Sequence, residues 1–124
     1  MHYKVLFRIE KIELVEKLKQ KIKNYERYCQ EEGDTCEISV VCAGSIVKHF
    51  RNVALKLEKG IAIDPEIDID PDFDREDLDI ALCRNALGGW GFSDVFYKNI
   101  RTVRAGIGEI IKKKAEGYIE YTIE

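Results

Sequence analysis

The chain has 124 residues, of which 45% are hydrophobic and 35% are charged, and its formal net charge at pH 7 is −3. This length fits one domain, residues 1–124, whose core needs no disulfide bonds. The slightly acidic balance argues against nucleic acid and anionic membranes as partners. The apolar stretch within residues 1–8 is too short for a signal peptide or a membrane span, so we expect a cytoplasmic protein.

Hydrophobic periodicity predicts strands and helices that alternate along the chain. The predicted strands span residues 3–9, 35–42, 80–83, 100–103 and 118–124. The predicted helices span residues 10–28, 46–57 and 106–116. A repeated strand-helix order indicates an α/β domain with a mainly parallel sheet and helices on both of its faces.

The last predicted strand alternates strictly between apolar and polar residues. Ile119, Tyr121 and Ile123 fall on one face, while Glu120 and Thr122 fall on the other. A central parallel strand is apolar on both faces, so this pattern predicts a position at a sheet edge or at a subunit interface. Self-association through this strand is therefore an expectation.

Cys83 is the most informative residue, because it lies where the apolar run 80–82 meets a turn and a predicted helix start. In open α/β sheets, ligands bind beyond the carboxyl ends of the strands. Backbone N–H groups of the following helix and the positive charge of Arg84 would stabilise a thiolate there. The alternative is a small buried hydrophobic residue, since free cysteine is among the most buried residue types.

The other cysteines are expected to be structural. An intracellular chain of this size normally keeps its thiols reduced, and no cysteine spacing fits a metal site, so we expect neither a disulfide nor a metal. Cys29 and Cys36 are assigned to the core. Cys42 also ends a strand, but the usual strand order would place the first strand between the strands of Cys42 and Cys83. The two cysteines would then lie about 10 Å apart, beyond the ~7 Å limit between the Cα atoms of a disulfide.

Two further segments invite functional interpretations. Trp90 and Phe92 lie in a glycine-rich stretch after Cys83. They form either a lid over a site, a contact with a partner, or an extension of the core. The acidic stretch 64–79 is interpreted as a solvated insertion or loop in which Asp70 and Pro71 start a short helix, with docking to a basic partner as a weaker alternative. It does not fit a calcium-binding loop, because Phe73 stands at the position that requires glycine.

Three stretches of the chain resemble the DsrE-like proteins of the DsrE/DsrF superfamily. They are Val-Leu-Phe-Arg-Ile-Glu at 5–10, Ala-Leu-Cys-Arg-Asn-Ala-Leu at 81–87, and residues 103–118, which begin Val-Arg-Ala-Gly-Ile-Gly-Glu-Ile-Ile and end Ala-Glu-Gly-Tyr. The resemblance implies a three-layer α/β/α domain with a five-stranded parallel sheet, assembled as a homotrimer or homohexamer. Several such proteins transfer sulfur inside the cell, with a single cysteine that carries persulfide sulfur. Cys83 stands at the place of that cysteine.

The residues around Cys83 form a candidate group that would support an anion or a thiolate, namely Arg84, Asn85, Arg104 and Gly106. The family's last motif commonly reads Val-Pro-Ala-Gly, and here Arg104 replaces the proline. The amides of the helix that begins near Gly106 could face an anion together with Arg84. The alternative is that the glycine only permits close helix packing, and the third glycine of a dinucleotide-binding motif is missing, so we expect no cofactor.

The sequence therefore predicts a sulfur carrier or a persulfide sulfurtransferase in which Cys83 accepts sulfane sulfur from a donor protein and passes it to an acceptor protein. No serine or cysteine hydrolase arrangement can be identified. The competing hypothesis is a noncatalytic module of the same fold that binds a small ligand or serves in assembly. Exposure of Cys83 in the folded protein distinguishes the two.

Overall fold

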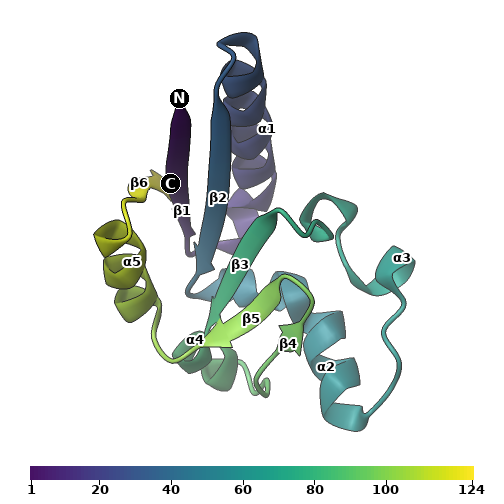
Figure 1. The fold of residues 1–124 in the computed structure, drawn as a ribbon. Helices are drawn as coiled ribbons and strands as arrows, with labels where there is room; N and C mark the ends of the chain where they lie inside the picture. Colours follow the sequence, from purple (N-terminus) through teal and green to yellow (C-terminus); the bar gives the residue numbers. More distant parts are fainter.

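A six-stranded sheet in the order β4-β5-β3-β2-β1-β6 runs through the protein in the computed structural model, which describes all of residues 1–124 (Figure 1). The strands are β1 (His2–Ile9), β2 (Thr35–Cys42), β3 (Leu78–Cys83), β4 (Phe96–Tyr97), β5 (Ile100–Val103) and β6 (Ile119–Ile123). The α-helices are α1 (Val15–Glu31), α2 (Arg51–Lys59), α3 (Pro65–Asp68), α4 (Arg84–Gly89) and α5 (Gly106–Ala115). Short 3₁₀ helices η1 (Ile12–Leu14), η2 (Ser45–Phe50) and η3 (Pro71–Phe73) lie before α1, before α2 and after α3.

Five of the strands are parallel, in agreement with the sequence analysis, but the sheet has a sixth strand that was not predicted. The two-residue strand β4 pairs antiparallel with β5, with Tyr97 opposite Ile100. The turn between them places Lys98 at φ 52, in the left-handed region where glycine or asparagine is the usual signal. Thr102 of β5 holds the residue that precedes β4. Its hydroxyl donates to the carbonyl of Val95 and accepts a hydrogen bond from the N–H of Val95.

Helices cover both faces of the sheet, as predicted, but the two faces are unequal. The face toward α1 and α2 holds a cluster of 22 buried hydrophobic residues, whereas the face toward α5 holds a cluster of five (Figure 1). Neighbouring residues of β1 illustrate the alternation, since Phe7 belongs to the large cluster and Leu6 to the small one. None of the helices combines the length and the apolar character that crossing a membrane requires.

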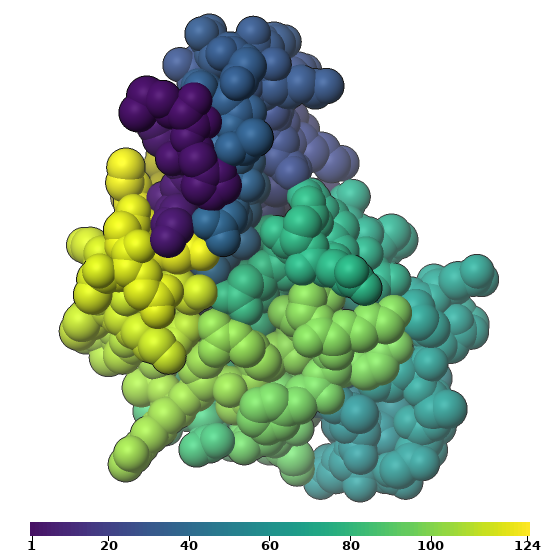
Figure 2. Space-filling model, in the orientation of Figure 1, coloured from purple at the N-terminus to yellow at the C-terminus, as the bar shows by residue number.

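The strand order differs from the expected one. β3 lies directly beside β2, with Cys42 opposite Leu82, and β1 does not separate them. The reason is that β1 is flanked by β2 on one side and by β6 on the other, so β3 joins the free edge of β2. Figure 2 shows the result at the surface, where the C-terminal segment lies beside the N-terminal strand. The predicted edge position of β6 is confirmed.

The acidic stretch 64–79 is only partly solvated, which narrows the interpretation made from the sequence. Ile69, Phe73 and Leu78 are buried in the large cluster, whereas Ile67 is exposed. Asp70 is the N-cap of η3, with Pro71 at the first helical position, as the sequence predicted. The segment is thus a folded part of the core.

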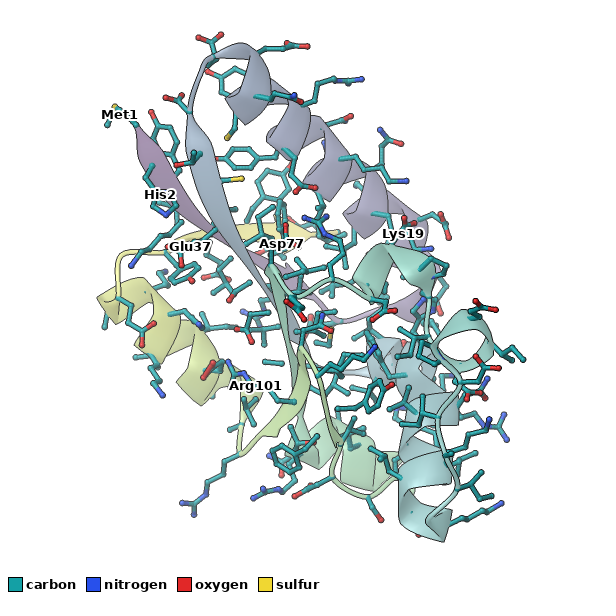
Figure 3. All side chains as sticks on the ribbon, turned by 45° about the vertical axis from the view of Figure 1, so that its right-hand side comes forward. Met1, His2, Lys19, Glu37, Asp77 and Arg101 are labelled. Atoms are coloured by element: carbon teal, nitrogen blue, oxygen red, sulfur yellow. The ribbon has the colours of Figure 1, made fainter.

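Most carboxylates of this stretch are paired within the chain, whereas Asp64, Glu66 and Glu76 have no positively charged partner. Asp68 lies 2.6 Å from the Lys56 ammonium, with its side chain almost fully buried. Asp70 contacts Lys19 of α1 and the His49 ring, the latter at 2.8 Å. Figure 3 shows Lys19 facing this segment from the start of α1. The acidic composition therefore reflects internal ion pairs.

A polar network joins β2, β3, β5 and α5 on the face of the sheet that α5 covers. Arg101 donates to both oxygens of Asp79 at 2.9 and 3.0 Å and to Glu109 at 2.6 Å, and lies between β5 and α5 (Figure 3). The Ser39 hydroxyl donates to Asp79 at 2.8 Å, and the Lys113 ammonium lies 3.3 Å away. Burial raises the pKa of Asp79, but these hydrogen bonds and positive charges outweigh burial and hold it below the ordinary value of 3.8.

We expect Asp79 to make the stability of the protein depend on acidic pH. Because its folded pKa is lowered, its contribution is fully present above the unfolded value of 3.8 and is lost as the pH falls through the folded pKa. The Asp79→Asn variant should therefore show a smaller loss of unfolding free energy between neutral pH and pH 2 than wild type, measured by urea denaturation. Glu58→Gln, on the exposed face of α2, serves as the control. Equal pH profiles for wild type and Asp79→Asn would contradict this assignment.

Candidate functional site

The carboxyl ends of the parallel strands β1, β2, β3 and β5 form one edge of the sheet, and Cys83 lies on it. Cys83 is the last residue of β3 and the N-cap of α4, with an extended backbone conformation (φ −67, ψ 124). It belongs to the same face of the strand as Ala81, the face covered by α5. The residue is 7% exposed, so the thiol lies just beneath the surface of this edge.

The N-terminus of α5 packs directly against Cys83. A Cβ placed on Gly106 would lie 3.7 Å from the Cβ of Cys83, 3.6 Å from Cγ1 of Val41 and 3.2 Å from the Cβ of Ala43. The last of these contacts is tight, so Gly106 permits the close packing that the sequence analysis considered. This packing also brings the positive end of the ten-residue α5 dipole toward the thiol. Both interpretations of Gly106 are therefore compatible with its position.

The other predicted supporting residues differ in their surroundings. Arg84 donates through Nε to Asp94 at 3.1 Å and places NH2 3.0 Å from the second oxygen, which offsets the positive charge expected to act on Cys83. Arg104 is exposed and has no carboxylate within 4 Å, so its charge is free at this edge. Asn85 is exposed on the first turn of α4.

The two aromatic residues proposed as a lid, Trp90 and Phe92, differ in their burial. Phe92 is partly buried and packs against the large hydrophobic cluster, as the core interpretation expected. Trp90 is half-exposed at the end of α4, with the Lys48 ammonium 4.2 Å from its ring centre. The glycines before it, Gly88 and Gly89, belong to α4 rather than to a loop.

The remaining cysteines lie elsewhere, and all four are free. Cys42 is fully buried in the large cluster, on the opposite face of the sheet from Cys83, and burial raises the pKa of its thiol. A Cys42–Cys83 pair is thus prevented by the direction of the side chains and not by an intervening strand. Burial, together with neighbouring Cys29, raises the pKa of Cys36 to about 11.

The structure also contains a groove that the sequence analysis did not identify. It has a volume of about 420 Å³ and lies between α1 and the strands β1 and β6. Its walls are mainly apolar, and Ile119 and Tyr121 of β6 are 67% and 47% exposed there. The alternating pattern of β6 was a signal for an apolar face, but it does not reveal that α1 leaves this face uncovered. The eight lining residues are Val5, Phe7, Lys21, Asn24, Tyr25, Ile119, Glu120 and Tyr121.

Comparison with known proteins shows a likeness in fold. No family model and no curated protein matches the chain. Among solved structures, the chain is similar to a protein of unknown function, MTH1491 from Methanobacterium thermoautotrophicum, with a TM-score of 0.65 and 18% sequence identity over 97% of this chain and 98% of that one. The two chains therefore share an α/β fold over essentially their whole lengths.

Proposed function

We propose that this protein carries sulfane sulfur on Cys83, in the manner of the DsrE-like proteins that its sequence resembles. The position of Cys83 carries the proposal: it ends a parallel strand at the carboxyl edge of the sheet, and the N-terminus of α5 packs against it. Ligand-binding groups of open α/β sheets gather at this edge. The sequence motif at residues 81–87 supports the same assignment.

The proposed chemistry is an exchange between thiols and persulfides. The Cys83 thiolate attacks the outer sulfur of a donor persulfide, R–S–SH. The bond between the two donor sulfurs breaks, its electron pair leaves with the donor thiolate, and Cys83–S–SH forms. An acceptor thiolate then attacks the outer sulfur of Cys83–S–SH, which forms the acceptor persulfide and restores the Cys83 thiolate. Sulfur moves without net oxidation, and no cofactor is needed.

The surroundings of Cys83 suit the negatively charged sulfur in each step. The free N–H groups at the start of α5 carry a partial positive charge, which stabilises an anion close to the first turn. Arg104 immediately precedes this helix and is free of carboxylate partners. Arg84 supports the thiolate less than the sequence suggests, because Asp94 neutralises it.

The resemblance also supports a cytoplasmic homotrimer or homohexamer that meets separate donor and acceptor proteins. The uncovered edge of β6 offers one surface for assembly, since an edge strand exposes unpaired backbone N–H and C=O groups.

A second candidate function is a noncatalytic module that uses the carboxyl edge to bind a small ligand or a protein. The low exposure of Cys83 favours it, because a buried cysteine usually acts as a small hydrophobic side chain. The pairing of Arg84 with Asp94 also fits a structural role for this turn.

Intact-mass analysis after incubation with a polysulfide donor distinguishes the two functions. We expect wild type and Cys42→Ala to gain about 32 Da, one sulfur atom bound as a persulfide, and to lose it on reduction, whereas Cys83→Ala should gain none. The buried Cys42 makes a matched control, because it ends the neighbouring strand and faces the opposite side.

A gain of sulfur that persists in Cys83→Ala would reject Cys83 as the carrier. Absence of any gain with several donors, together with failure of Cys83 to react with iodoacetamide until the protein is unfolded, would leave the noncatalytic module as the better explanation.

A further inference from the structure

We propose that the groove between α1 and β6 binds an apolar molecule that bears one carboxylate, of about the size of a two-ring aromatic acid. This inference is independent of sulfur transfer, because the groove lies on the α1 face of the sheet whereas Cys83 faces α5. Its volume of about 420 Å³ falls within the usual range for small-molecule sites.

The apolar walls of the groove come from three elements. β1 contributes Val5 and Phe7 to the groove, and α1 contributes Tyr25. β6 contributes Ile119 and Tyr121. Phe7 and Tyr121 pack edge to face, with ring centres 5.8 Å apart. Ile119 and Tyr121 are therefore adjacent exposed apolar side chains on the wall of a groove, and contiguous apolar surface of this kind marks ligand or partner sites.

Two polar side chains of the groove, Lys21 and Asn24, have hydrogen-bond donors that no acceptor in the chain occupies. Lys21 is partly buried, has no carboxylate within 4 Å, and reaches from α1 to a point 5.8 Å from the ring centre of Tyr121. The carbonyl oxygen of Asn24, one turn later on α1, accepts from Gln20 at 2.8 Å and Arg27 at 3.2 Å. Its amide nitrogen therefore stays available as a donor.

The only acidic residue that lines the groove does not satisfy these donors. Glu120 lies 3.4 Å from the Lys114 ammonium and 3.8 Å from the Arg8 guanidinium. With Glu120 neutralised, Lys21 leaves an uncompensated positive charge at the mouth of an apolar groove. A carboxylate complements both the charge of Lys21 and the free amide of Asn24. A cation would be repelled by Lys21, and an uncharged molecule would leave the charge of Lys21 without a counter-ion.

The test compares 2-naphthoate with its neutral analogue 2-naphthalenemethanol, by calorimetry and by backbone amide chemical-shift mapping. We expect saturable binding of naphthoate, about fivefold tighter than the alcohol at low salt, as one partly exposed charge pair provides. Lys21→Met should reduce naphthoate affinity to that of the alcohol and leave alcohol binding unchanged. Ile119→Ser should weaken both, and Lys112→Met, an exposed lysine of α5 outside the groove, should change neither.

Three results would overturn the proposal. The first is absence of saturable naphthoate binding, or equal affinities for the two probes. The second is a set of shifted amides that lies away from α1, β1 and β6. The third combines two observations: sedimentation detects a wild-type dimer that Ile119→Ser dissociates, and the probes bind only to the variant. The groove would then be an interface between two copies of the chain.

Discussion

Replacing Gly44 with alanine is expected to lower the free energy of unfolding by about 3 kcal/mol or more. Gly44 has φ +117 and ψ −154, a conformation that is essentially restricted to glycine. An added Cβ would also lie 2.7 Å from the carbonyl oxygen of Glu10. That oxygen is a backbone atom and accepts a hydrogen bond from the N–H of Ile46 at 3.0 Å, so it cannot move aside cheaply. Chemical denaturation measures the loss.

Gly33→Ala is the matched control for this prediction. Gly33 also has a positive φ, of 72, but an added Cβ there meets no atom within 4 Å. The Gly33→Ala variant should lose only about 1 kcal/mol of unfolding free energy, the cost of placing a residue with a side chain in the left-handed conformation. Equal losses in the two variants would show that the close approach of the loops after β1 and β2 is unimportant.

Replacing Phe73 with alanine is expected to cost about 3–4 kcal/mol of stability, as for other fully buried phenylalanines. Phe73 is 2% exposed, and its ring lies 5.6 Å from that of His49 and 5.8 Å from that of Phe50. The substitution would leave a cavity between η3 and η2, which carry Phe73 and its aromatic neighbours. Thermal and urea unfolding both measure this loss.

Ile67→Ala provides the comparison within the same acidic stretch. Ile67 is 73% exposed on α3, so its loss should stay within about 0.5 kcal/mol. A solvated insertion would make both substitutions nearly neutral, and that result would contradict the packing described here for Phe73.

Sequence periodicity predicted the parallel strands because their signals are local. The apolar runs of β1, β2 and β3 and the helical spacing of α1 and α5 are visible without knowledge of their neighbours. The hairpin of β4 and β5 was missed because its turn uses Lys98 at positive φ instead of glycine, and because two residues are too few for a pattern. Charge dominated the interpretation of residues 64–79, although Ile69 and Phe73 in that stretch are core residues.

The candidate site was predictable to the extent that it depends on strand ends. Cys83 ends β3 at the expected edge, and Gly106 begins the helix packed beside it. The contacts of the individual side chains were not predictable, because they depend on tertiary positions. Arg84 pairs with Asp94, ten residues later, and the side chain of Cys42 points away from that of Cys83 although their strands are adjacent. The α1–β6 groove requires knowledge of where a helix stops covering a sheet, which no local pattern contains.

The pairing of β1 with β6 has a consequence for biosynthesis. Val5 lies opposite Ile119 and Phe7 opposite Tyr121, so nearly the whole chain must leave the ribosome before β1 acquires its second neighbour. Until then the nascent sheet presents the Val-Leu-Phe segment of β1 as an open edge, which other nascent chains can pair with. Closure of so long a loop is also slow. The edge of β1 is therefore exposed to aggregation from its synthesis until β6 pairs with it.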